Sequence, residues 1–261
     1  MSDMLKVRKL MLVFLVVALL LFVTGCVGES NGADKKRVTI LVGAAAGTAD
    51  AISEIEPLFE KVSGIDVDLQ FSASGPIKEQ IKSGAGIDVY ITASKKDIDE
   101  LVSLKLVEED EVLLTNKLIL AKTKGSDVKG VDDLVGVDYV AIGEPGSVPV
   151  GKYATEALKN LGLYDALKGK LTFAKDVTQV LNWVESGNAE AGFVYYSDFV
   201  RSAGGVEMVE EVDQGVYSRI LFPMGLVSAS EKKTEAREFM GFLRSDEAKA
   251  VFVKYGFGIP E

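Results

Sequence analysis

Hydrophobic positions change their period repeatedly along the chain. The short, mostly apolar run 38–42 is typical of a buried strand, and the β-favouring residues of 65–71 predict a second strand. The first run is followed by a segment, Ile52 to Val62, in which apolar residues recur at helical spacing until Ser63-Gly64 stops them. Alternation of strands and helices over this length predicts an α/β protein with mainly parallel sheets.

The same pattern predicts further elements. Strands are expected at 88–92, 117–121, 139–142, 191–195 and 219–228. Helices are expected at 77–81, 95–104, 152–160, 177–186 and, as one helical region, 234–254.

The last strand and the last helical region are too few for a domain of their own. We therefore expect them to complete a first lobe, with the chain crossing to a second lobe near 120–123 and returning near 221–225. Two crossings placed side by side form a hinge, and the cleft between two α/β lobes is a favoured ligand site.

The N-terminus has the layout of a secretory signal. Three basic residues precede an apolar run, 10–23, of only fourteen residues, whereas a membrane helix needs about 20; an uncleaved anchor is the alternative. The expected organisation is a lipoprotein signal peptide (1–25), a flexible tether (26–36), lobe 1 (37–120 plus 224–261) and lobe 2 (121–223).

Val23-Thr24-Gly25-Cys26 resembles a lipobox, after which a peptidase cuts just before a cysteine that carries lipid. The alternative is that Cys26 is a stray thiol. With lipid on Cys26 the protein would be tethered to the outer face of the cytoplasmic membrane, in the periplasm or at the cell surface.

Composition excludes several function classes. The 261 residues contain no histidine and one cysteine, so a catalytic Ser-His-Asp or Cys-His system, a His-rich metal site and an internal disulfide are ruled out. The net charge is −10, and −12 without residues 1–25, which hold three basic and one acidic residue. An acidic chain without a basic run argues against a nucleic-acid partner. The acidic run 108–111 is interpreted as a solvated face rather than a metal site.

Five loops could carry the binding chemistry: 44–48, 72–76, 143–151, 175–177 and 194–198. We expect none of them to offer a cation. Four of them run into predicted helices, whose N-termini favour an anion through unpaired backbone N–H groups and the helix dipole. The alternative interpretation is that each loop, taken singly, is an ordinary turn between a strand and a helix. Ser74 would then cap the helix after 72–76, and Asp176 the helix after 175–177. The residues alone predict a two-lobed binder of a small solute; an anion is compatible with the helix starts, and the residues do not decide its charge.

Residues 143–154 resemble a motif of the periplasmic molybdate-binding proteins that serve ABC importers; they read Gly143-Glu-Pro-Gly-Ser-Val-Pro-Val-Gly-Lys-Tyr-Ala154. The resemblance runs over about 38–260, supported by 71–75, 85–93, 192–198 and 254–257. It implies the type II periplasmic binding protein fold: two similar α/β lobes joined by a hinge, with the ligand cleft between them.

The resemblance also implies a ligand site. Ser74 would donate through its hydroxyl and backbone N–H, Val150 and Val177 through backbone N–H, and Tyr195 through its phenol. The family's first binding serine aligns with Gly47, where a hydroxyl donor is lost; the Gly47 N–H remains, and Thr48 is the candidate replacement.

Neighbouring polar residues are expected to have other roles. Asp176 and Glu144 should face away from the ligand, Asp176 as a helix cap. Ser72, Thr92 and Tyr153 should be structural. A pocket made only of donors suits molybdate, tungstate or sulfate, which are fully deprotonated at neutral pH, whereas phosphate retains a proton.

The leading hypothesis is a non-enzymatic, lipid-anchored, monomeric receptor. It would deliver molybdate or tungstate to an ABC permease and its ATPase, with no cofactor and no metal bound as a free cation. The alternatives are a binder of another oxyanion such as sulfate, or a sensory domain; with nothing after residue 261, a partner would have to carry the signal. An enzyme is disfavoured. Two-lobed α/β folds also occur in porphobilinogen deaminases, but these need a cysteine inside the fold that carries a cofactor, and Cys26 lies in the signal.

Overall fold

The computed structural model describes residues 37–260. The predicted signal peptide, tether and lipid-bearing Cys26 lie outside the described residues. Within 37–260, no helix combines the length and apolar character that crossing a membrane requires.

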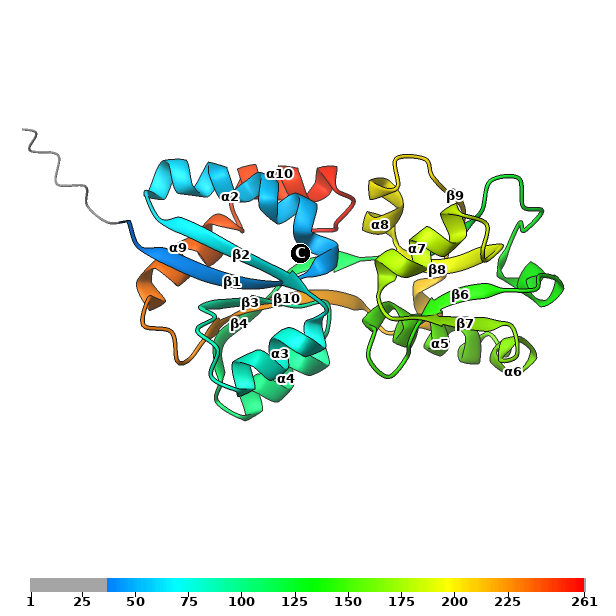
Figure 1. The fold of residues 1–261 in the computed structure, drawn as a ribbon, viewed down its shortest axis with the longest axis horizontal. Coiled ribbons are helices and arrows are strands. Elements are labelled where there is room, and N and C mark those ends of the chain that lie inside the picture. The colour runs from blue at the N-terminus through cyan, green and yellow to red at the C-terminus, as the bar shows by residue number, and fades with distance from the viewer. Residues whose placement is uncertain (1–36, 261) are drawn as a thin grey trace, which may run out of the picture. The chain divides into compact units, whose positions relative to one another are not determined.

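The described chain forms two five-stranded sheets, each flanked by helices (Figure 1). The first sheet has the strand order β2-β1-β3-β10-β4. β1 is parallel to β2 and β3, whereas β10 is antiparallel to β3 and β4. Its strands are β1 (Thr39–Ala45), β2 (Asp66–Ser72), β3 (Val89–Ile91), β4 (Val107–Asn116) and β10 (Ile220–Val227).

Helices pack on both faces of the first sheet. One face meets α3 and α4 through a small cluster that includes Ile77, Ile98 and Tyr90. The other face meets α2, α9 and α10 through the main hydrophobic cluster. In this cluster the rings of Phe59 and Phe239 pack edge to face, with their centroids 5.1 Å apart. The helices are α2 (Ala49–Ser63), α3 (Ser74–Lys82), α4 (Lys95–Ser103), α9 (Lys233–Phe242) and α10 (Asp246–Lys254), with the short 3-10 helix η1 (Ala46–Thr48) before α2. We call this set of elements the first lobe.

The second sheet repeats the plan, with the order β7-β6-β8-β5-β9. β6 is parallel to β7 and β8, and β5 is antiparallel to β8 and β9. Its strands are β5 (Leu118–Lys122), β6 (Val140–Gly143), β7 (Leu171–Ala174), β8 (Ala191–Tyr195) and β9 (Glu207–Glu211). The helices are α5 (Pro149–Asn160), α6 (Tyr164–Leu167), α7 (Val177–Glu185) and α8 (Tyr196–Arg201), with η2 (Val131–Gly136) and η3 (Gln214–Val216). These elements form the second lobe, and the predicted two-lobed α/β fold is confirmed.

The chain changes sheets at two neighbouring places. Only Lys117 separates β4 from β5, and the return strand begins at Ile220, which pairs with Asn116. Both sheet changes fall a few residues earlier than the expected boundaries after 120 and after 223, because β5 pairs wholly in the second sheet and β10 wholly in the first.

Three further expectations need correction. The sheets are mixed rather than mainly parallel, because one strand in each sheet, β10 or β5, runs against both of its neighbours. The last helical region is two helices, since Ser245 caps α10 by accepting a hydrogen bond from Ala248 N at 3.2 Å. Strands β4, β7 and β9 were not expected; β4 contains the acidic run 108–111, whose carboxylates pair with Lys233, Arg237 and Arg244.

Candidate functional site

A cavity of about 330 Å³ lies where strand ends and helix starts of both lobes meet. It contains five of the six residues that the sequence assigned to a ligand: Gly47, Ser74, Val150, Val177 and Tyr195. Its first-lobe lining is Ala45, Ala46, Gly47, Ser72, Ala73, Ser74, Ala93 and Phe222. Its second-lobe lining is Val148, Pro149, Val150, Lys175, Asp176, Val177, Thr178 and Tyr195. Residues more than a hundred positions apart in sequence therefore share one cavity.

Gly47 lies in η1, between the end of β1 and the start of α2. A Cβ added to Gly47 would meet no atom within 4 Å, so the position has room for a side chain. Thr48, the sixth predicted residue, is fully buried and does not line the cavity. Its Oγ1 donates to the carbonyl of Ala45 at 2.8 Å, so its hydroxyl hydrogen is engaged inside the lobe. The structure therefore does not bring Thr48 to the place of the missing serine.

Ser74 is the first residue of α3 rather than its cap, which is Ala73, and it is 2% exposed. Its Oγ accepts a hydrogen bond from Ala93 N at 3.0 Å, and its carbonyl accepts one from the Tyr90 hydroxyl at 2.8 Å. These bonds fix the serine and leave its hydroxyl hydrogen available for a second acceptor. The N–H of a first-turn residue has no partner within the helix. Ser74 can thus offer two donors to one oxyanion.

The turn before α5 places Val150 at the cavity. Val148 N and Ser147 N both donate to the carbonyl of Glu144, at 2.7 and 3.1 Å, and Pro149 then begins the helix. Gly151 is required here, because a Cβ would lie 1.8 Å from the carbonyl oxygen of Gly143. Val150 is fully buried and lies in the first helical turn, where its N–H has no intrahelical acceptor.

Asp176 caps α7, as predicted: its Oδ1 accepts from Gln179 N at 2.8 Å. Asp176 belongs to the lining, but this carboxylate oxygen serves the helix start rather than a ligand. Val177 is the first residue of the helix and presents another backbone N–H. Glu144, the second acid that was expected to face away, is not part of the lining.

Tyr195 ends β8, and its hydroxyl is the most informative atom of the cavity. The side chain is 4% exposed, and the hydroxyl oxygen is buried without a hydrogen-bond partner among residues 37–260. Burial raises the pKa of Tyr195 well above its usual value, so the phenol stays protonated. Its ring contacts Phe222 edge to face at 5.7 Å, which fixes its direction. A buried donor without an acceptor costs free energy, and an oxyanion would satisfy it.

Lys175 corrects the expectation that no loop offers a cation, because it belongs to the lining. The residue is exposed, and it forms no ion pair with any acid between residues 37 and 260. The sequence carries the signal for this cation, because Lys175 is the first residue of the loop 175–177.

Other lining residues also differ from expectation. Ser72, expected to be structural, belongs to the lining, whereas Thr92 and Tyr153 do not. Thr92 is buried, and its Oγ1 accepts from Ser94 N at 3.0 Å. Ala93 and Phe222 were missed, because nothing in an apolar run indicates which member faces a cavity.

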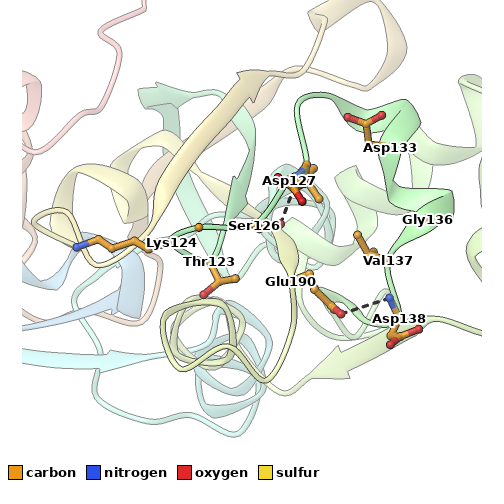
Figure 2. A pocket seen from close by; sticks show the side chains of 11 residues that line it. Thr123, Lys124, Ser126, Asp127, Asp133, Gly136, Val137, Asp138 and Glu190 are labelled. Carbon is orange, nitrogen blue, oxygen red and sulfur yellow. Dashed lines mark hydrogen bonds between the residues drawn. The ribbon is translucent and has the colours of Figure 1, made fainter.

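A larger cavity, of about 570 Å³, lies in the second lobe between the loop 123–128 and residues 133–138, at the end of η2 (Figure 2). Two of the four acids in its lining accept hydrogen bonds from backbone N–H groups: Glu190 accepts from Tyr139 N at 3.0 Å, and Asp133 accepts from Lys129 N at 2.8 Å. No group of three or more His, Cys, Asp or Glu residues in the described part of the chain is placed to hold a metal ion. None of the predicted ligand residues lies there, so the inter-lobe cavity is the candidate site.

A donor-lined cavity between two lobes is the architecture of a solute-binding protein. The sequence profile of the family "Bacterial extracellular solute-binding protein" matches residues 40–258, and the chain belongs to this family. The family binds and carries solutes, so the protein is a binding protein and not an enzyme.

Two relatives illustrate the family. The chain is 37% identical over 243 residues to a putative ABC transporter substrate-binding lipoprotein, YvgL, of Bacillus subtilis, covering 91% of this chain and 93% of the relative. It is 34% identical over 237 residues to the molybdate-binding protein ModA of Escherichia coli, covering 87% and 91%.

Solved structures support the same fold. The substrate-binding domain of a putative molybdenum ABC transporter from Clostridium difficile is 38% identical, with a TM-score of 0.73 over 86% of this chain and 100% of that domain. The periplasmic molybdate-binding protein of Azotobacter vinelandii, 24% identical, has a TM-score of 0.75 over 85% of this chain and all of that one, which shows the fold alone.

Proposed function

We propose that the protein captures molybdate or tungstate between its lobes and delivers it to the permease and ATPase of an ABC importer. The observation that carries this proposal is the buried Tyr195 hydroxyl, which lacks an acceptor and belongs to a cavity with the helix starts at Ser74, Val150 and Val177. Molybdate binding is the activity named for several relatives of substantial identity.

The donor set favours a fully deprotonated anion. Hydrogen bonds to a charged acceptor are about twice as strong as neutral ones, and each candidate group donates. The lining contains one carboxylate, Asp176, and its Oδ1 caps α7. A monoprotonated phosphate needs an acceptor for its O–H, and among the lining side chains only the remaining oxygen of this carboxylate could serve, so comparing phosphate with molybdate tests the preference directly.

Ligand size implies closure of the lobes. A four-oxygen anion occupies roughly three water volumes, about 100 Å³ or less. The cavity of about 330 Å³ is larger, so all donors reach one anion only when the lobes approach each other. The paired sheet crossings at Asn116 and Ile220 supply a hinge for this motion. The lobe boundaries that we propose are those expected from sequence, adjusted so that β5 lies in the second lobe and β10 in the first.

The N-terminal predictions complete the proposal. Lipid on Cys26 would hold a monomeric receptor at the outer face of the cytoplasmic membrane, and a relative that shares 37% of its residues carries the word lipoprotein in its name. Cys26→Ser should move the protein from the membrane fraction to the soluble fraction; retention in the membrane fraction would contradict lipid attachment at this residue.

Thermal unfolding tests the ligand. At about 1,000 times Kd, a ligand adds roughly 4 kcal/mol to the free energy of unfolding. Molybdate and tungstate should raise the unfolding midpoint, and calorimetric titration should then give their Kd values. If sulfate or phosphate raises the midpoint and the two metal oxyanions leave it unchanged, the ligand assignment is wrong.

A further inference from the structure

Asp198 is a fully buried carboxylate directly behind the ligand cavity. It lies in α8, three residues after Tyr195, and does not line the cavity itself. Its Oδ2 accepts from Tyr195 N at 3.2 Å, and its Oδ1 accepts from Arg201 Nη2 at 2.9 Å. Burial raises the pKa of Asp198, while the Arg201 guanidinium acts in the opposite direction. A buried carboxylate needs such partners, so the pair fixes the backbone that carries the Tyr195 phenol.

Arg201 also reaches the other lobe. Its Nε lies 3.9 Å from Oδ2 of Asp50, in the first turn of α2. Asp50 follows Gly47 of the cavity lining by three residues. One guanidinium therefore joins the strand end that carries Tyr195 to the helix start that follows Gly47.

Two further contacts hold α8, which lies beside the loop after α10 in Figure 1, against the first lobe. Asn116 Nδ2, at the end of β4, donates to Ser197 Oγ at 2.9 Å, and both side chains are buried. Gly256, after α10, has a φ of +82° and approaches α8 so closely that a Cβ would lie 2.9 Å from Val200. With α8 held in this way, Arg201, its last residue, lies at the junction of the two lobes.

We propose that Arg201 is a positioning residue for ligand binding, a role that rests on the proposed function. It orients Tyr195 through Asp198 and, through Asp50, holds the strand end that carries Tyr195 beside the helix start that follows Gly47. Affinity for the oxyanion then depends on three charged residues that do not line the cavity. The side chains of Arg201 and Asp50 are 31% and 52% exposed, so solvent weakens their attraction and the contribution of this pair is modest.

A double-mutant cycle tests the coupling. Kd for molybdate and for tungstate is measured by calorimetric titration for the wild type, Asp50→Asn, Arg201→Gln and the double variant. Asp50→Asn should raise Kd about two- to five-fold, the range expected for a partly exposed ion pair, and should leave the midpoint without ligand unchanged. Arg201→Gln should raise Kd further, because Tyr195 loses its support. Adding Asp50→Asn to Arg201→Gln should then have no further effect.

Two additional variants separate positioning from folding. If Arg201→Gln does not fold, Arg201→Lys replaces it in the cycle, because lysine keeps a cation beside the buried Asp198. The Arg201→Lys variant should lose the coupling to Asp50. Asp68→Asn removes an exposed acid of the same lobe that has no ion pair within residues 37–260. It controls for net charge and should leave Kd unchanged.

The outcomes distinguish the two proposals. If the wild type binds an oxyanion and Asp50→Asn changes Kd no more than Asp68→Asn does, or changes it equally in both Arg201 backgrounds, the positioning role is wrong and the proposed function stands. If the wild type binds neither molybdate nor tungstate, the proposed function fails and the positioning role falls with it.

Discussion

Removing the hydroxyl of Tyr195 should have opposite effects on the free protein and on the complex. The hydroxyl oxygen is buried without a partner among the described residues. An unsatisfied buried polar group costs about 1–3 kcal/mol. Tyr195→Phe relieves this cost and keeps the edge-to-face contact with Phe222, so the protein without ligand should gain about 1 kcal/mol of stability. For a body of this size, that gain corresponds to a rise of about 2–4 °C in the unfolding midpoint.

With ligand the sign reverses. A hydrogen bond from a neutral donor to a charged acceptor contributes about 1.5–3 kcal/mol, so Tyr195→Phe should raise Kd for molybdate by about 10- to 150-fold. Differential scanning calorimetry without ligand and calorimetric titration with it measure the two effects separately.

Tyr153→Phe is the matched control. Tyr153 is 6% exposed and lies in α5, burial raises the pKa of its phenol to about 12, and the residue does not line the cavity. Removing the Tyr153 hydroxyl should leave Kd for molybdate unchanged. A lower midpoint for ligand-free Tyr195→Phe, or an unaltered Kd, would refute the assignment of this hydroxyl as a donor waiting for an acceptor.

Further substitutions test other parts of the cavity. Gly47→Ser should lower Kd by adding a hydroxyl donor, since the position has open space for a side chain. Gly47→Ala should leave Kd unchanged. If calorimetric titration gives the two variants the same Kd, a donor role at this position is contradicted. Lys175→Gln should slow association of the dianion at low salt, and much less at high salt, because salt screens the charge. Lys168→Gln, which removes an exposed lysine outside the lining, should not slow association. If stopped-flow association rates of the two variants are equal at low salt, steering by Lys175 is excluded. Gly151→Ala should lower stability by about 3 kcal/mol, because its Cβ would overlap the carbonyl of Gly143; chemical denaturation measures the change, and an unaltered midpoint would contradict this overlap.

Sequence patterning was sufficient for the order of elements and for the loops that meet at the cavity. Strand 191–195, helix start 177 and the cap at Asp176 agree with the structure because local periodicity and capping chemistry determine them. The motif 143–154 located the α5 start, where Pro149 and Gly151 each have a local steric reason.

The expectations that the structure corrected have different causes. The direction of β5 and β10 relative to their neighbours is a property of the pairing, and the four residues of β7 are too few for a period. The orientation of Thr48 depends on a carbonyl three residues earlier, which spacing does not reveal. The break before α10 did have a local signal, because Ser245 followed by two acids is a common helix start.

The aromatic side chains at the junction of the lobes make the two halves a single cooperative unit. Phe222 contacts Tyr195 at 5.7 Å and Phe257 at 5.5 Å, and one hydrophobic cluster runs through both sheets. Neither lobe has a core that could be separated without exposing these rings. The described body should therefore unfold in one transition, so that a ligand bound between the lobes shifts the whole melting curve rather than one half of it.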